Sequence, residues 1–110
     1  MRSLSIAIPL LVLVAAPSFA EDRTLQECTA LGYFSGAQDK FMIGLALHIL
    51  TKKGVLNTAP CNAAREEAYD VGVSFSRSGK IANSAEAAVV KSVAAFSAAV
   101  YSAVAKNMEP

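Results

Sequence analysis

Two cysteines, Cys28 and Cys61, limit the folds open to this 110-residue chain more than any other residues. In an exported protein the compartment is oxidising, and cysteines there usually occur as disulfides. Two cysteines allow a single intramolecular pairing. Closing a loop of this size contributes about 3–4 kcal/mol to the free energy of unfolding in the loop-entropy model. We therefore predict a small domain pinned by one Cys28–Cys61 disulfide.

The evidence for export lies in the first twenty residues. Arg2 is followed by an apolar run over residues 4–16 and then by small residues, a pattern typical of a cleaved signal peptide. A membrane anchor is the alternative, but the run is too short to span a bilayer and contains Pro9. We expect residues 1–20 to be the signal peptide and residues 21–110 to be one helical domain in the periplasm.

The charge of the predicted mature domain excludes some partners. Arg2 is one of the ten Lys and Arg residues, and the nine Asp and Glu residues all follow residue 20, so the mature domain carries no net charge. A neutral chain has no field that holds nucleic acid or an anionic membrane by itself. We therefore expect neither nucleic acid nor a membrane surface as a partner.

The first helix has recognisable signals at both ends. Thr24 and Glu27 have the spacing of a capping box, and "TKKG" (51–54) places two lysines in a last turn and glycine after it. We predict one continuous helix between these signals. Its second half, "FMIGLALHIL" (41–50), is apolar nearly all round and is expected to be central in the fold. The predicted buried stripe is Cys28, Leu31, Phe34, Ala37, Phe41, Leu45 and His48.

Two further helices follow a loop that contains Pro60. Thr58 or Asn62 can cap the second helix, and Gly79 marks its end. A capping box at Asn83 begins the third helix. The fold class predicted is all-α, a small three- to four-helix bundle with one intramolecular disulfide. The predicted inner faces are Ala64, Ala68, Val71 and Phe75, and then Val89, Val93, Phe96, Val100 and Val104.

Gly32 and Gly36 lie one turn apart on one face of the first helix. Glycine in a helix interior costs about 0.5–1 kcal/mol relative to alanine, so a packing reason is expected. We predict that the two glycines form a groove for another backbone, and that the alanine-rich C-terminal helix fills it. Residues 87–105 resemble a membrane span in hydropathy, but Lys91 and several serines favour a packed helix.

The sequence shows little that favours catalysis. His48 is the only histidine, and no residue at a fixed spacing orients it as a base for either cysteine. The carboxylates Glu66, Glu67 and Asp70 are typical of a solvated helix face or, alternatively, a contact surface. Phosphate loops and hydrolase elbows are absent from the sequence. We expect no enzyme activity, no cofactor and no metal site.

The loop between the first two helices is the candidate binding element. It is held at one end by a helix and at the other by Cys61, and a tethered loop loses little entropy when it docks. The alternative is that it only connects two helices. The candidate contact residues for a protein partner are Lys53, Val55, Leu56 and Asn57.

Four stretches together resemble a known family. These are "CTALGYFSG" with its Gly-Tyr-x-x-Gly step, the acidic Asp39 after it, "PCNAAREEAYDVGVSF" and "SAEAAVVKSVAAF". They are similar to the Tai-like immunity proteins, which protect the periplasm against amidase toxins delivered by type VI secretion. The resemblance implies a helical protein that blocks the active-site cleft of a peptidoglycan amidase, often as a homodimer.

A second class of protein also resembles this chain. Small acid-stress chaperones of the periplasm share its size, helical content and single disulfide. Below pH 4 carboxyl groups take up protons while lysine and arginine stay charged, so a neutral protein becomes cationic. Such a chain is expected to open and expose residues 41–50 to client proteins.

Overall fold

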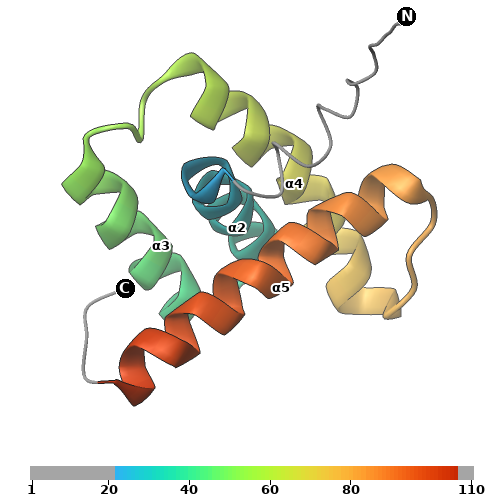
Figure 1. The fold of residues 1–110 in the computed structure, drawn as a ribbon. Helices are drawn as coiled ribbons and strands as arrows, with labels where there is room; N and C mark the ends of the chain where they lie inside the picture. The colour runs from blue at the N-terminus through green and yellow to red at the C-terminus, as the bar shows by residue number, and fades with distance from the viewer. Residues whose placement is uncertain (1–21, 107–110) are drawn as a thin grey trace, which may run out of the picture.

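The computed structural model describes residues 22–106, and this part of the chain is all-α (Figure 1). No strand occurs within residues 22–106, and the disulfide joins Cys28 to Cys61. The predicted fold class is therefore confirmed. The predicted signal peptide lies outside the described residues. The helices are α2 (Arg23–Ala37), α3 (Lys40–Lys53), α4 (Ala59–Ser78) and α5 (Ser84–Ala105).

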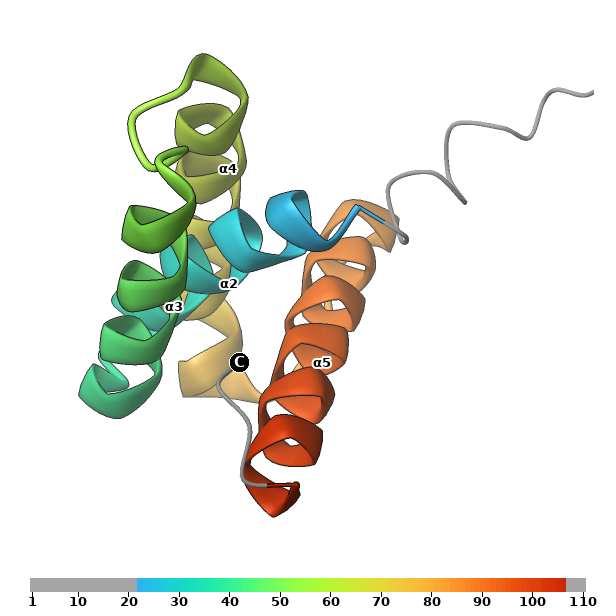
Figure 2. The ribbon, with the colours of Figure 1, turned by 60° about the vertical axis from the view of Figure 1, so that its left-hand side comes forward.

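Helix α2 is the centre of the bundle, and the other three helices pack around it. Figure 2 shows α3 and α5 on opposite sides of α2, with α4 behind. The expectation that residues 41–50 are central is wrong, because α3 packs chiefly against α2 and leaves Phe41 71% exposed. The buried core is formed by Cys28, Ala30, Leu31, Phe34, Met42, Ala46, Ile49, Leu50, Cys61, Ala68, Val71, Val89, Val93, Phe96 and Val100.

The predicted first helix is in fact two helices. Gln38 takes the left-handed conformation at φ 61°, and its N–H donates to the carbonyl of Ser35 over 3.3 Å. Asp39 then caps α3, since its Oδ1 accepts from the backbone N–H of Met42 over 3.1 Å. The prediction of one continuous helix missed this break.

The break also changes which face of α3 is buried. A left-handed residue rotates the helix that follows relative to the one before it, so the stripe cannot continue through Gln38. Leu45 is half-buried, and Phe41 and His48 are exposed, so the predicted stripe is wrong after residue 37. The residues buried instead are Met42, Ala46, Ile49 and Leu50.

The other predicted helix ends are mostly correct. Gly54 and Gly79 are C-caps with φ of 73° and 69°, and Asn83 caps α5 by accepting from the N–H of Glu86 over 2.9 Å. The start of α2 differs, because Asp22 rather than Thr24 is its N-cap and accepts from Leu25 N–H over 3.0 Å. Thr58 precedes α4 without a side-chain cap bond.

The glycines of α2 do form a groove for another backbone, but the helix in it is α4. A Cβ atom on Gly32 would lie 2.2 Å from the carbonyl oxygen of Arg65. Helix α4 supplies a third glycine, Gly72, and a Cβ atom added to it would lie 2.0 Å from the carbonyl oxygen of Tyr33. The predicted partner, the C-terminal helix, is wrong, because the disulfide holds α4 beside α2 one turn before Gly32.

Helix α5 packs on α2 through Val89, Val93, Phe96 and Val100, as predicted. Val104 is 59% exposed, so its predicted place on the inner face is wrong. Among the described residues α5 is the one helix that is long and apolar enough to cross a membrane, and 28% of its most apolar stretch is buried. This assignment rests on the length and composition of α5 alone, and helices buried in a protein core can have the same length and composition.

Candidate functional site

The disulfide places the start of α4 against the first turns of α2. The Cα atoms of Cys28 and Cys61 lie 5.3 Å apart, and both residues are buried at 0% and 1% exposure. Because Cys61 is the third residue of α4, the bond fixes the end of the loop that enters this helix. The loop of residues 54–58, here called the α3–α4 loop, therefore ends at a covalent anchor.

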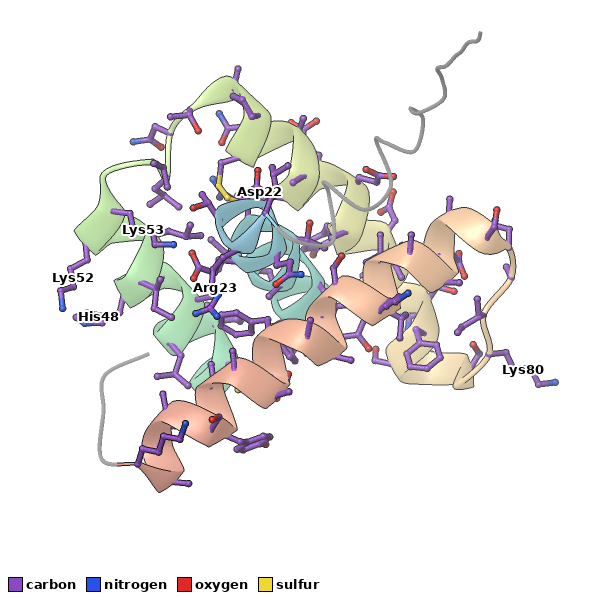
Figure 3. The ribbon with its side chains drawn as sticks, in the orientation of Figure 1. Asp22, Arg23, His48, Lys52, Lys53 and Lys80 are labelled. Atoms are coloured by element: carbon purple, nitrogen blue, oxygen red, sulfur yellow. A yellow bond between two sulfur atoms is a disulfide. The ribbon has the colours of Figure 1, made fainter. Side chains whose placement is uncertain are left out.

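An ion pair fixes the other end of the same loop. Lys53, the last residue of α3, places its Nζ 2.6 Å from Glu27 Oε1 in α2, and this ammonium also donates to Thr24 Oγ1 over 3.2 Å. Glu27 is only 4% exposed, so its carboxylate depends on this partner. Figure 3 shows Lys53 directed toward α2, whereas Lys52 and His48 point away from it.

The α3–α4 loop also carries hydrogen bonds of its own. The Val55 N–H donates to the carbonyl of Leu50 over 3.3 Å, and Thr58 donates to the carbonyl of Val55 from both N–H (3.1 Å) and Oγ1 (2.8 Å). Arg65 Nη1 in α4 donates to the carbonyl of Leu56 over 3.4 Å. Loop backbone groups paired in this way restrict the loop to one conformation.

The four predicted contact residues differ in how much they face solvent. The ammonium of Lys53 is engaged in the ion pair with Glu27, although the lysine side chain is 37% exposed. Val55 and Leu56 are half-buried and pack against the core. Asn57 is exposed. Asn57 and Lys53 are thus the predicted residues that reach solvent, and Lys53, Val55 and Leu56 also hold the loop in place.

A shallow hollow accompanies the loop, and three of its residues, Thr51, Gly54 and Thr58, are not among the contact residues predicted from the sequence. Thr51 from the last turn of α3 and Thr58 from the start of α4 contribute hydroxyl groups to it, and Leu56 supplies apolar surface. Thr51 precedes the loop and Thr58 is its last residue, so the hydroxyl groups at the two ends of a tethered loop were the available signal. The hollow is lined by Thr51, Gly54, Leu56, Asn57 and Thr58.

No titratable residue of the described part of the chain lines this hollow. Glu66, Glu67 and Asp70 are exposed on α4, as expected for a solvated face. Burial raises the pKa of Tyr33, at the α2–α4 crossing, above its usual value of 10.0. Within residues 22–106, no group of three or more His, Cys, Asp or Glu side chains is arranged to hold a metal ion.

Comparison with known proteins adds no relative. No family model matches the chain, and no curated protein or solved structure is significantly similar to it. The α3–α4 loop and its hollow are therefore interpreted from their own chemistry. That chemistry is hydroxyl and amide groups around a small apolar surface, on a loop anchored at both ends.

Proposed function

We propose that this chain is a periplasmic immunity-type protein that binds and neutralises a peptidoglycan amidase toxin delivered by type VI secretion. The observation that carries the proposal is the anchoring of the α3–α4 loop by the Glu27–Lys53 ion pair and the Cys28–Cys61 disulfide. The resemblance in "CTALGYFSG" and the signal-like N-terminus supply the class of partner and the compartment. The protein acts by occupying the toxin's active-site cleft.

Anchoring at both ends favours binding for a thermodynamic reason. Ordering a loop on docking costs about 0.5–1.5 kcal/mol for each flexible side chain that becomes immobile, besides the backbone cost. A loop already held by two anchors and by its own hydrogen bonds avoids most of the backbone cost. The exposed amide of Asn57 and the hydroxyls of Thr51 and Thr58 then offer hydrogen bonds to a cleft, with Leu56 as the apolar contact.

The test is a binding measurement with the mature protein and purified peptidoglycan amidases encoded beside its gene. We expect a Kd below micromolar for one of them and loss of its hydrolytic activity in the complex. Asn57→Arg should weaken this binding at least about tenfold, because it places a bulky charge in the contact. Ala82→Arg adds the same side chain to the exposed loop between α4 and α5 and should leave binding unchanged.

Two results would contradict the proposal. The first is the absence of binding to any of these amidases at micromolar concentration. The second is equal binding by wild type and Asn57→Arg, which would move the contact surface away from the α3–α4 loop.

The second candidate function, an acid-stress chaperone, is favoured by the same ion pair. The Glu27–Lys53 ion pair joins the end of α3 to the first turns of α2, and losing it would remove this link between the two helices. The face of α3 that would then be released carries Met42, Ile49 and Leu50. Suppression of client aggregation at pH 2–3 tests this candidate, and a bundle that stays closed at that pH rules it out.

A further inference from the structure

A second hollow lies on the surface where α2 and α4 cross. Its volume is about 340 Å³, which is within the range of pockets that hold small ligands. It shares no lining residue with the hollow beside the α3–α4 loop. We call it the α2–α4 hollow, and it is lined by Gly32, Ser35, Asn62, Arg65, Glu66 and Tyr69.

The two helices that form this hollow are fixed relative to each other. A Cβ atom on Gly32 would lie 2.2 Å from the Arg65 carbonyl oxygen, so the two backbones are in direct contact here. The Cys28–Cys61 disulfide joins the same two helices one turn before Gly32. A site whose walls are already fixed loses little conformational entropy when a ligand binds.

Arg65 is oriented in the α2–α4 hollow by its neighbours. Its Nη1 donates to Asn62 Oδ1 over 3.0 Å and to the Leu56 carbonyl over 3.4 Å. Its Nε–H and Nη2–H groups have no hydrogen-bond partner within residues 22–106. The guanidinium group is therefore held in place and still has donors for a ligand.

Glu66 and Tyr69 supply an acceptor and an aromatic ring to the same hollow. Within the described part of the chain, neither the Glu66 carboxylate nor the Tyr69 hydroxyl makes a hydrogen bond or an ion pair. Tyr69 is 49% exposed, so part of its ring is open to contact. The hollow thus combines donors from Arg65, acceptors from Glu66 and an apolar ring surface within about one turn of α4.

The two charges favour a ligand that is neutral. Arg65 disfavours a cation and Glu66, the next residue, disfavours an anion. Each hydroxyl group of a sugar can donate one hydrogen bond and accept others. Two neighbouring hydroxyls therefore accept from the guanidinium and donate to the carboxylate at the same time, while the C–H face of the sugar ring packs on the tyrosine ring.

A peptide fits the α2–α4 hollow less well. Extended peptides bind through the free main-chain groups of a sheet edge, and helical peptides bind in an apolar groove. Both walls here are helices, whose main-chain groups are bonded within the helix, and the lining side chains are polar or charged. Neither mode of peptide recognition is therefore offered.

We propose that the α2–α4 hollow binds a neutral saccharide. Arg65 and Glu66 pair with adjacent hydroxyl groups of the sugar, and Tyr69 packs on the face of its ring. This site is separate from the loop proposed to bind an amidase, and it does not depend on that function.

The proposal is tested by NMR titration of the mature protein with two neutral trisaccharides, triacetylchitotriose and maltotriose. For at least one of them we expect saturable shifts at the backbone amides of Gly32, Ser35 and Glu66. The expected Kd is about 0.1–10 mM, because a shallow hollow covers only one side of the ligand. Inorganic phosphate and glycylglycine serve as charged probes and should not shift these amides.

Two substitutions with matched controls assign the contacts. Glu66→Ala removes the acceptor and should weaken binding at least about fivefold. Glu67→Ala removes an exposed carboxylate that does not line the hollow and should leave binding unchanged. Tyr69→Ala should weaken binding to a similar extent, whereas Tyr101→Ala, at an exposed tyrosine of α5, should not. Far-ultraviolet circular dichroism shows whether each variant remains folded.

Three outcomes overturn this proposal. The first is the absence of saturable shifts with both trisaccharides at concentrations well above the expected Kd. The second is an equal or stronger response to phosphate or glycylglycine, which would mean that the hollow recognises charge. The third is equal binding by the Glu66→Ala and Glu67→Ala variants. No amidase enters this titration, so its result is independent of the test of the proposed function.

Discussion

The backbone of Gly36 in α2 lies so close to Tyr69 in α4 that an added Cβ atom would sit 2.2 Å from the Tyr69 carbonyl oxygen. This contact cannot be relieved by a side-chain rotation, because the atom it meets belongs to the backbone. The crossing of α2 and α4 therefore depends on the absence of a side chain at this position, and the disulfide lies near one end of that crossing.

Gly36→Ala should destabilise the protein by about 1–3 kcal/mol, as overpacking forces the two helices apart. Gly44→Ala is the matched control, since Gly44 lies within α3 and no atom is within 4 Å of its added Cβ. That change should instead stabilise the protein by about 0.5–1 kcal/mol through helix propensity. Urea unfolding of both variants measures the difference, and equal effects would mean that the crossing is looser than described.

Lys53→Ala should destabilise the protein because it leaves the Glu27 carboxylate buried without its ion-pair partner. We expect the free energy of unfolding to fall by about 1–3 kcal/mol. This is less than for a fully buried ion pair, because the lysine is partly exposed to solvent. Lys80→Ala removes a lysine that points into solvent (Figure 3) and should change stability by less than about 0.5 kcal/mol. Thermal unfolding of the two variants side by side distinguishes these effects, and equal melting temperatures would contradict the role of the pair.

Gln38→Gly should stabilise the protein. Gln38 is held in the left-handed region at φ 61°, where a residue with a Cβ atom costs about 1–2 kcal/mol and glycine does not. A gain of about 1 kcal/mol in the free energy of unfolding is expected from urea denaturation. If α2 and α3 were one continuous helix, the same change would destabilise the protein, as glycine does in any helix interior.

Tyr33 should ionise above pH 10, because burial raises the pKa of its phenol in the folded state. The unfolded chain releases this proton first, so the stability linked to Tyr33 is present below pH 10 and is lost as the pH rises through the folded-state pKa. The difference in absorbance at 295 nm between wild type and Tyr33→Phe isolates this ionisation. A midpoint at or below pH 10 would contradict the partial burial of Tyr33.

Local signals in the sequence predicted most of the helix ends. Gly54, Gly79 and Asn83 each act through a few neighbouring residues, so their positions could be assigned without knowledge of the fold. The break at Gln38 could not, because glutamine is uncommon in the left-handed conformation and gives no signal. The capping aspartate that follows it, Asp39, was the one available clue.

Contacts between distant residues account for what the sequence did not predict. Gly72 has no feature that pairs it with the α2 glycines until the disulfide brings α4 beside α2. Likewise, Glu27 has the spacing of a capping residue, but its carboxylate accepts a hydrogen bond from Lys53, which lies 26 residues later. This long-range pair makes Lys53 an anchor of the α3–α4 loop, a role that its position in the sequence did not predict.

Amide hydrogen exchange at Val55 and Thr58 tests most directly whether the α3–α4 loop is held in one conformation by its two anchors. Both amides are hydrogen-bonded within residues 50–58, so we expect slow exchange in the oxidised protein and much faster exchange after reduction of the disulfide or in Lys53→Ala. Fast exchange at both amides in the oxidised wild type would contradict the anchored loop and remove the basis for its role in binding.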